Sequence, residues 1–272
     1  MTNRAAVLGS PISHSLSPAL HQAGYAALGL TDWIYETVEM TESGLGPWLA
    51  GLGPEWRGLS LTMPLKRTAL GLVDHVQPLA KMVGGANTVL FNQAGTVGAN
   101  TDVHGMVAAV REARPDGAFR SASVIGGGAT AAAALAALAE LALRRPRVYI
   151  RSVARSQPTL AAAGRLGVEP ELRKLRPEQP PPDWPADLTI CTLPPHAADP
   201  LAEGLGEALV PSGALLLDVA YSPWPSALAD AWARAGGKVV SGKAMLLHQA
   251  AAQFQMMTGH AAPLAQMRAA IA

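Results

Sequence analysis

Four short polar segments in the N-terminal half contain the side chains best suited to chemistry. They are Ser13–Pro18, Ser60–Lys66, Gly85–Thr88 and Asn100–Asp102. Each segment falls where an apolar, strand-like run ends or a helix-like run begins. Such positions converge on the ligand crevice of an open α/β sheet. The segments therefore predict one ligand site built from distant parts of the chain.

A glycine turn follows in the sequence Val124-Ile125-Gly126-Gly127-Gly128-Ala129-Thr130-Ala131, which has the pattern G-x-G-x-x-A. The first glycine permits a tight turn, and the second lets the backbone approach a pyrophosphate. The small third residue lets the helix and strand pack closely. The helix start would offer free N–H groups and the positive end of its dipole to phosphates. We predict dinucleotide binding by Gly126, Gly127, Gly128, Ala129 and Thr130.

The strand after this turn ends in Arg151-Ser152-Val153-Ala154-Arg155. An NAD site usually has an acidic residue here for the ribose 2′-hydroxyl, and this segment has none. Guanidinium groups bind phosphate bidentately, so Arg151, Ser152 and Arg155 favour NADP, with its 2′-phosphate, over NAD. The alternative is a solvated arginine face. We expect that role for Arg144, Arg145 and Arg147.

The composition excludes several classes of protein. Hydrophobic residues make up 49% of the 272 residues and charged residues 15%, which allows a buried core and argues against disorder. A net charge of +1 gives no bulk attraction to nucleic acid or anionic membrane. The single cysteine, Cys191, is expected to be a buried strand residue and fits a reducing cytoplasm. We expect no signal peptide, no membrane span and no metal site.

Apolar runs alternate with helix-like segments, which is typical of an α/β protein with mostly parallel strands. Strands are predicted at Ala5–Leu8, Trp33–Val38, Leu59–Met63, Ala122–Ile125, Val148–Arg151, Leu188–Leu193, Ala214–Val219 and Val239–Val240, and a hairpin at Thr88–Phe91 and Thr96–Ala99. Helices are predicted at Pro18–Leu28 with Ser17 as N-cap, Val103–Arg114, Ala129–Arg144, Ala244–Met257 and Leu264–Ala272. The proline-rich, charged stretch Glu169–Pro185 is expected to be a surface connection.

In order and spacing, the polar segments resemble those of the shikimate dehydrogenase family. Further matches are the glycine turn, the arginine segment, Asp218–Pro223, and Gly242–Leu246 followed by Gln249. The resemblance covers essentially the whole chain. It implies an N-terminal α/β substrate-binding domain plus a Rossmann-like NADP-binding domain, with a cleft between them. We place the first domain at residues 1–103 plus 240–272 and the second at 104–239.

The resemblance also implies the activity, which is reversible NADPH-dependent reduction of 3-dehydroshikimate to shikimate in aromatic amino acid (chorismate) biosynthesis. By the same resemblance, Ser15 and Ser17 hold the substrate carboxylate. Other matched positions bind the substrate or lie near it, namely Thr62, Lys66, Asn87, Asp102, Tyr221 and Gln249. Val219 and Gly242 match cofactor positions. As ordinary structural residues, Asn87 would be a turn residue, Gln249 an exposed helix residue and Tyr221 a packing tyrosine.

Only the resemblance identifies Lys66 and Asp102 as the catalytic pair. Oxidation of an alcohol carbon requires a group that takes the hydroxyl proton, and the reverse reaction requires a donor. A free lysine, with a pKa of about 10.4, is protonated near neutral pH, yet a protonated amine can polarise a developing alkoxide. Asp102 would orient the lysine and the substrate hydroxyl. As structural residues, Lys66 would be a surface lysine and Asp102 a helix N-cap.

Three positions depart from the family pattern. Ser60 stands where the family commonly has Asn, Ala129 where glycine is frequent, and Ile150 before Arg151 where Asn is usual. Three rival functions stay open at this point, namely a quinate/shikimate dehydrogenase with NAD or dual cofactor use, a non-catalytic ligand sensor, and a methylenetetrahydrofolate-type dehydrogenase. An aminoshikimate substrate is also compatible with the sequence. The expected partner is a small-molecule substrate, and a homodimer is left open.

Overall fold

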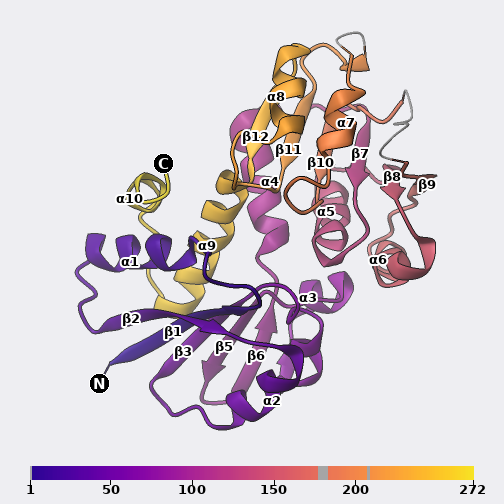
Figure 1. The fold of residues 1–272 in the computed structure, drawn as a ribbon. Helices are drawn as coiled ribbons and strands as arrows, with labels where there is room; N and C mark the ends of the chain where they lie inside the picture. Colours follow the sequence, from indigo (N-terminus) through magenta and orange to yellow (C-terminus); the bar gives the residue numbers. More distant parts are fainter. Residues whose placement is uncertain (1, 177–182, 207–208) are drawn as a thin grey trace. The chain divides into compact units, whose positions relative to one another are not determined.

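Two six-stranded sheets organise the chain (Figure 1), and each belongs to a different compact unit. The computed structural model describes residues 2–176, 183–206 and 209–272. Its first unit comprises residues 1–105 and 246–272, and its second comprises residues 106–245. Helices α4 (Asp102–Ala113) and α9 (Gly242–Thr258) carry the chain from one unit to the other. The domain boundaries predicted from the sequence lie at 103/104 and 239/240.

The sheet of the first unit has the strand order β2-β1-β3-β5-β6-β4. Its strands are β1 (Asn3–Gly9), β2 (Trp33–Glu39), β3 (Trp56–Leu61), β4 (His75–Val76), β5 (Thr88–Asn92) and β6 (Gly95–Ala99). β1 pairs in parallel with β2 and β3, while β5 is antiparallel to β3 and β6. The predicted hairpin is confirmed as β5–β6. Consequently β1, β3 and β6 all end at the same edge of the sheet, where β5 begins.

Helices cover both faces of this sheet. On one face, α1 (Ser17–Ala27), α9 and α10 (Leu264–Ala269) bury Leu20, Tyr25 and Phe254 against β1 and β2. The other face buries Leu45 of α2 (Glu42–Ala50) and residues of the 3-10 helix η1 (Thr68–Gly71) and of α3 (Pro78–Val83) against β3 and β5. Fully burying one such leucine stabilises the fold by about 1.5–3 kcal/mol. The polar edge therefore rests on a sheet that is packed on both sides.

The sheet of the second unit is parallel throughout, with the strand order β12-β11-β10-β7-β8-β9. Its strands are β7 (Ala122–Ile125), β8 (Arg147–Ile150), β9 (Glu171–Lys174), β10 (Leu188–Cys191), β11 (Leu215–Asp218) and β12 (Lys238–Ser241). In chain order within the unit this is 6-5-4-1-2-3, which is the order of a Rossmann fold. The Rossmann-like domain predicted from the sequence is therefore confirmed.

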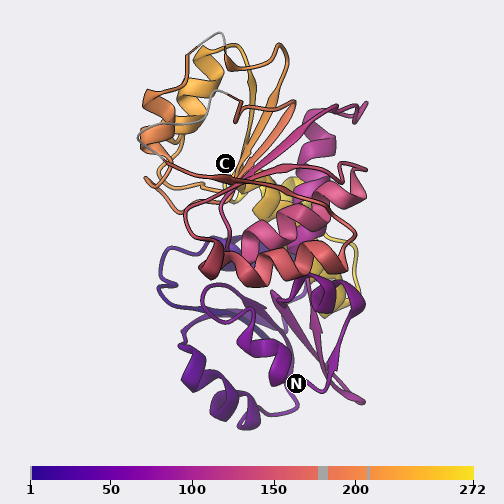
Figure 2. The ribbon, with the colours of Figure 1, turned by 90° about the vertical axis from the view of Figure 1, so that its right-hand side faces the viewer.

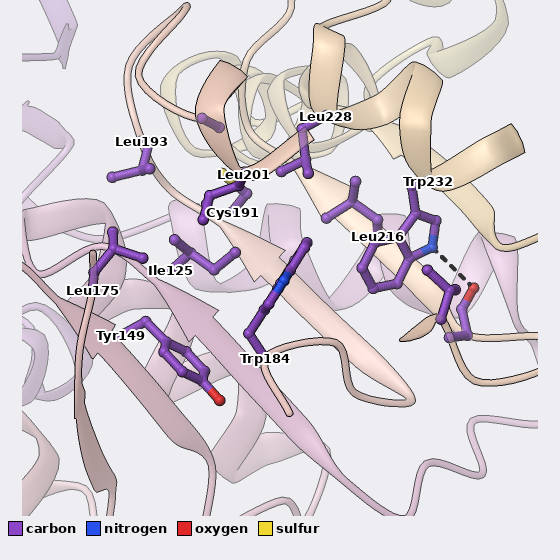
Figure 3. Close-up of a cluster of buried hydrophobic side chains, with 13 residues drawn as sticks. Ile125, Tyr149, Leu175, Trp184, Cys191, Leu193, Leu201, Leu216, Leu228 and Trp232 are labelled. Carbon is purple, nitrogen blue, oxygen red and sulfur yellow. Dashed lines mark hydrogen bonds between the residues drawn. The ribbon is translucent and has the colours of Figure 1, made fainter. Parts of the chain in front are cut away.

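Helices also flank this second sheet on both sides. Figure 2 shows α7 (Asp199–Glu203) and α8 (Ala227–Arg234) on one side of the strands, and α5 (Ala129–Glu140) and α6 (Val153–Arg165) on the other. Figure 3 shows the core beneath α7 and α8, where Trp184 and Trp232 lie with ring centroids 5.6 Å apart. Because both faces are covered, β10 and β11 are mostly apolar and are buried along their length.

Several predicted boundaries are wrong in detail. Ser17 is the first residue of α1 and not its N-cap, because Leu16 already has helical backbone angles. β3 ends at Leu61, two residues before the predicted Met63. α5 ends at Glu140 and does not reach Arg144, because Ala142 takes a left-handed conformation that turns the chain.

The stretch Glu169–Pro185 is not simply a surface connection. Glu171–Lys174 forms the edge strand β9, whose residues are all exposed, and Trp184 is buried in the core. Residues 177–182 of this stretch lie outside the described residues. An exposed, charged edge strand lacks the apolar alternation by which a strand is recognised in sequence.

Cys191 is buried in β10, as predicted, and burial raises the pKa of its thiol. Within the described ranges, no helix is both long enough and apolar enough to cross a lipid bilayer.

His21 is a fully buried histidine in the core of the first unit. Its ring stacks on Tyr35 with a centroid separation of 4.1 Å and an interplanar angle of 14°. Burial lowers its pKa from 6.5 to about 3, and the Gln253 amide only partly opposes this shift. Neither ring nitrogen has a hydrogen-bond partner of normal geometry. The native state therefore holds a neutral imidazole in an apolar stack.

This burial predicts a pH-dependent stability. The unfolded chain takes up a proton on His21 near pH 6.5, whereas the native chain does so only near pH 3. The contribution of the neutral His21 ring to the free energy of unfolding is fully present above about pH 6.5. It is lost as the pH falls toward 3, by up to about 1.4 kcal/mol per pH unit. Between pH 7 and 5, urea unfolding should show the parent losing about 2 kcal/mol more than the His21→Phe variant. The exposed His260→Phe variant is the control and should follow the parent. Equal losses in the parent and in His21→Phe would contradict this account.

Candidate active site

Lys66 and Asp102 form a buried ion pair at the polar edge of the first unit. The Lys66 Nζ donates to the Asp102 Oδ2 at 2.7 Å, and the two side chains are 15% and 7% exposed. Lys66 follows the end of β3, and Asp102 follows the end of β6 as the first residue of α4. The parallel direction of these two strands thus brings together residues that are far apart in the sequence. A proton-handling pair at a strand edge can act on a bound hydroxyl.

Asn87 fixes the other carboxylate oxygen of Asp102. Its Nδ2 donates to the Asp102 Oδ1 at 2.9 Å and to the Thr101 Oγ1 at 2.9 Å. Its Oδ1 accepts from the Thr101 backbone N–H at 2.7 Å, which sets the orientation of the amide. Asn87 is 2% exposed and is therefore more than a turn residue. Both oxygens of Asp102 thus have donors within the protein.

Asn100 caps the start of α4 and leaves the Asp102 side chain free for other contacts. The Asn100 Oδ1 accepts from the backbone N–H groups of Asp102 and Val103, and its Nδ2 donates to the Gly85 carbonyl. A side chain that accepts from the first N–H groups of a helix acts as its cap. The reading of Asp102 as a helix N-cap is therefore wrong.

Gln249 of α9 lies beside this pair. Its Oε1 is 3.3 Å from the Asn87 Nδ2 and 3.4 Å from the Thr101 Oγ1, while its Nε2 donates to the Leu246 carbonyl. Gln249 is buried, so the reading of it as an exposed helix residue is wrong. The structure brings Lys66, Asn87, Asp102 and Gln249 into one hydrogen-bonded group.

Ser15 and Ser17 lie at the start of α1, and Thr62 directly follows the end of β3. Ser17 is buried and Ser15 is partly buried, and the Ser15 Oγ accepts from the Ser17 N–H at 3.3 Å. The Thr62 N–H donates to the Leu8 carbonyl at 2.9 Å. A Cβ on Gly9 would meet the Thr62 Cγ2 at 2.3 Å, so this close approach needs the glycine. Hydroxyls at a helix start can hold an anion with no buried counter-charge.

The glycine turn of the second unit connects β7 to α5. Gly126 has a φ of +122°, which a side chain would strain, and a Cβ on Gly127 would meet the Ser156 Oγ. A Cβ on Gly128 would meet nothing within 4 Å, and no side chain caps α5 at its start. Ala131 is fully buried, as expected of the residue packed between helix and strand. The open side of the turn and the uncapped start of α5, where Ala129 and Thr130 lie, fit a pyrophosphate.

Thr159 of α6 ties this turn to the next helix. Its hydroxyl lies 2.8 Å from the Gly127 carbonyl oxygen and 3.1 Å from that of Gly128. Thr159 is 3% exposed. Thr159 lies outside the glycine motif and was not predicted to be a site residue.

The arginines of the second unit divide into two groups. Arg145 and Arg147 form ion pairs with Glu169 and Asp183, and Arg144 donates to backbone carbonyls. The Arg147 side chain is only 22% exposed, so the prediction of a solvated face is wrong for this residue. Arg151 and Arg155 are exposed and make no ion pair with the described part of the chain. Ser152 between them caps α6 by accepting from the Arg155 N–H at 3.4 Å.

Gly242 begins α9 in close contact with the end of β11. A Cβ there would lie 2.1 Å from the Val219 carbonyl oxygen, so only glycine fits. The neighbouring Asp218 is buried, and its oxygens accept from the Ala220 N–H and the Ser226 hydroxyl. Burial raises the pKa of Asp218. Tyr221 is half-buried, and desolvation raises the pKa of its phenol. Val219, Tyr221 and Gly242 all belong to the second unit.

Four further residues extend the buried hydrogen bonding of the first unit and were not predicted as site residues, namely Tyr35, Ser60, Thr88 and Gln253. Gln253 had a detectable signal, because it lies four residues after Gln249 on a predicted helix, where side chains share one face. Tyr35 carried no such signal, since its contact depends on the pairing of β2, β1 and β3.

The fold and the site define a class of protein in which a Rossmann unit is joined to a second α/β unit with a buried lysine–aspartate pair. Comparison with known proteins narrows this class. Residues 7–89 match the model of the shikimate dehydrogenase substrate binding domain, and residues 244–272 match that of the shikimate 5′-dehydrogenase C-terminal domain. The chain belongs to the shikimate dehydrogenase family.

Individual relatives support this placement over nearly the full length. The chain is 34% identical over 277 residues to the NADP(+) shikimate dehydrogenase of Thermosynechococcus vestitus, covering 99% of this chain and 95% of the relative. It is 40% identical to a Mycobacterium tuberculosis shikimate dehydrogenase crystal structure, with a TM-score of 0.86, over 99% of this chain and 98% of that one. A Thermus thermophilus shikimate 5-dehydrogenase solved with NADP(H) and shikimate matches with 32% identity and a TM-score of 0.82, with the same coverage of both chains.

Proposed function

We propose that the protein is an NADP-dependent shikimate dehydrogenase that reversibly reduces 3-dehydroshikimate to shikimate in chorismate biosynthesis. The observation that carries this proposal is the Lys66–Asp102 pair, buried at a sheet edge and oriented by Asn87. The NADP(+) shikimate dehydrogenases among the relatives, and the Thermus thermophilus complex with NADP(H) and shikimate, support the substrate and cofactor. The first unit would bind shikimate and the second NADP.

Each substrate group has a chemically suitable partner in the first unit. Ser15 and Ser17 would hold the carboxylate at the start of α1. Hydroxyl and amide groups of Thr62, Asn87 and Gln249 suit the ring hydroxyls, and Tyr221 of the second unit is proposed to lie near the substrate. Hydroxyls and amides can donate and accept, so each can match a ring hydroxyl in either direction. The Asp102 carboxylate would accept from the hydroxyl beside the reacting carbon.

Lys66 would handle the proton of the reaction. In the oxidation of shikimate, the reacting carbon loses a hydride while its hydroxyl loses a proton, and the Lys66–Asp102 pair takes that proton. In the reduction, the Lys66 amine donates to the carbonyl oxygen and stabilises the negative charge that develops there. Asp102 and Asn87 hold the amine in position through the 2.7 Å and 2.9 Å hydrogen bonds. NADP, when bound, supplies the hydride or accepts it.

The residues of the second unit fit NADP. The glycine turn and the uncapped start of α5 suit the pyrophosphate, and Val219 and Gly242, which lie close together, would also contact the cofactor. Arg151 and Arg155, exposed and without ion pairs in the described chain, suit a 2′-phosphate. The buried, unmodified Cys191 accords with a reducing cytoplasm as the compartment.

The proposal is tested by initial rates of oxidation, followed as NADPH or NADH absorbance, with shikimate and quinate each paired with NADP and NAD. We expect shikimate with NADP to be the best pair. Strong preference for NAD, or for quinate, would identify a quinate/shikimate dehydrogenase. Absence of turnover with every pair would contradict an enzymatic role.

The Lys66→Ala variant should lower turnover by about two or more orders of magnitude, with less effect on shikimate binding, because the lysine acts on the proton in the transition state. Turnover is measured by the same assay, and the shikimate dissociation constant by calorimetry. The control is Lys81→Ala, an exposed lysine of α3 that should leave both quantities unchanged. Parent-like turnover in Lys66→Ala would remove Lys66 from the mechanism.

The Arg151→Ala variant should raise the KM for NADP by roughly tenfold or more and leave the KM for NAD little changed, because a charge-assisted bond to phosphate is lost. Steady-state kinetics with both cofactors measure this. Arg145→Ala is the matched control, since this exposed arginine is paired with Glu169. If both variants gave the same KM for NADP, Arg151 would have no part in cofactor selection.

A further inference from the structure

A buried chain of hydrogen bonds continues behind the Lys66–Asp102 pair. The Tyr35 hydroxyl donates to the Ser60 Oγ at 2.6 Å, and the Ser60 hydroxyl donates to the Gln253 Oε1 at 2.7 Å. The Gln253 Nε2 donates to the Thr88 Oγ1 at 2.9 Å and to the Asn87 carbonyl oxygen at 3.0 Å. The members of this chain, namely Tyr35, Ser60, Gln253, Thr88 and Asn87, are each at most 5% exposed and all belong to the first unit.

The donors of this chain point in one direction. A hydroxyl has one hydrogen, so a Ser60 that donates to Gln253 can only accept from Tyr35. The Thr88 hydroxyl accepts from Gln253 and donates to the Asn87 Oδ1 at 2.9 Å. The Asn87 amide must then present its nitrogen to Asp102. The Thr88 hydroxyl, held from the Gln253 side, and the Thr101 N–H thus donate to the same Asn87 oxygen and together fix the orientation that Asn87 needs at the reacting pair.

The far end of the chain is the Tyr35 hydroxyl, which lies in the core of the first unit. The His21 ring stacks on Tyr35 at 4.1 Å and holds the phenol in place. Ser60 occupies the position where the family commonly has Asn, so this arrangement differs from the common family pattern.

We propose that Gln253 is a positioning residue for the reaction, and that Tyr35 and Ser60 hold Gln253 in the orientation that supports the Asn87–Asp102–Lys66 group. The proposal rests on the shikimate dehydrogenase function proposed above. Gln253 holds both the main-chain carbonyl of Asn87 and the Thr88 hydroxyl that orients the Asn87 amide. Loss of Gln253 would remove the support of the Asn87 carbonyl and of the Thr88 hydroxyl, would leave the Thr101 N–H as the main constraint on the Asn87 amide, and would so weaken the support of Asp102.

The two ends of the link predict different kinetic effects. Gln253→Leu keeps the size of the side chain but removes its acceptor and donor, and it should lower kcat roughly tenfold with an unchanged KM for NADP. Tyr35→Phe removes the hydroxyl that donates to Ser60 at the far end of the chain, and it should lower kcat by less than Gln253→Leu does, by about threefold, with an unchanged KM for NADP. In the double variant the combined loss of kcat/KM should be smaller than the product of the single losses, because both changes break one chain.

A matched control separates positioning from simple destabilisation. Phe254 is the next residue on α9 and is fully buried, but its ring belongs to the hydrophobic core. Phe254→Leu should lower the thermal midpoint while kcat and both KM values, measured well below that midpoint, stay within about twofold of the parent. A kcat in Gln253→Leu within twofold of the parent, or an equal loss of kcat in Phe254→Leu, would overturn the proposal. If the losses of kcat/KM in the two single variants multiplied fully in the double variant, the link through Ser60 would be overturned.

A second readout does not depend on turnover. Hydrogen exchange of the Asn87 side-chain amide, followed by NMR, should be at least about tenfold faster in Gln253→Leu than in the parent, and unchanged in Phe254→Leu. If the parent failed to oxidise shikimate, the proposed function would be wrong, yet this exchange rate would still decide whether Gln253 orients Asn87. Equal exchange in Gln253→Leu and the parent would contradict the positioning role.

Discussion

The site of the first unit depends on the hydrogen bonds of the Asn87 side-chain amide. It contacts Asp102 through its nitrogen and the Thr101 backbone through its oxygen, so one side chain fixes the carboxylate and the start of α4 together. This is feasible because β1, β3 and β6 run in parallel and end at one edge, where the antiparallel β5 begins beside Asn87. The strand topology thus brings these residues together, and the Asn87 amide orients the Asp102 carboxylate.

Burial makes this hydrogen-bonded arrangement rigid and also sensitive to the loss of any one partner. An unpaired polar group in a dry interior costs about 1–3 kcal/mol, so a buried polar network favours one conformation only when all its members are paired. The described chain satisfies this around Asp102, whose two oxygens accept from Lys66 and Asn87. His21 is the contrasting case, since its two ring nitrogens lack partners of normal geometry. A stacked Tyr35 ring and a neutral imidazole make that burial tolerable.

Sequence reasoning recovered the parts of the structure that short-range patterns encode. The β5–β6 hairpin follows from two apolar runs separated by a tight turn, and it is confirmed, as is the Rossmann-like domain that the family resemblance implied. The convergence of the four polar segments followed from their positions at strand ends, and the family resemblance singled out Lys66 and Asp102.

Other features depended on tertiary contacts. Ser17 was predicted to be the N-cap of α1 but is its first residue, because the helical conformation of Leu16 is not visible in residue types. The spacing from Gln249 placed Gln253 on the same helix face, but its partners Asn87 and Thr88 follow only from how α9 packs against the start of β5.

Helix α6 contains two features that are usually treated separately. Its first turn contains Arg155 of the arginine segment proposed to bind the 2′-phosphate, and one of its later residues, Thr159, contacts two carbonyl oxygens of the glycine turn proposed to bind the pyrophosphate. One rigid helix therefore connects the two proposed phosphate sites. For engineering of cofactor preference, the transferable module is the whole turn-and-helix unit. Exchanging the arginines alone would leave the glycine turn in contact with the same Thr159.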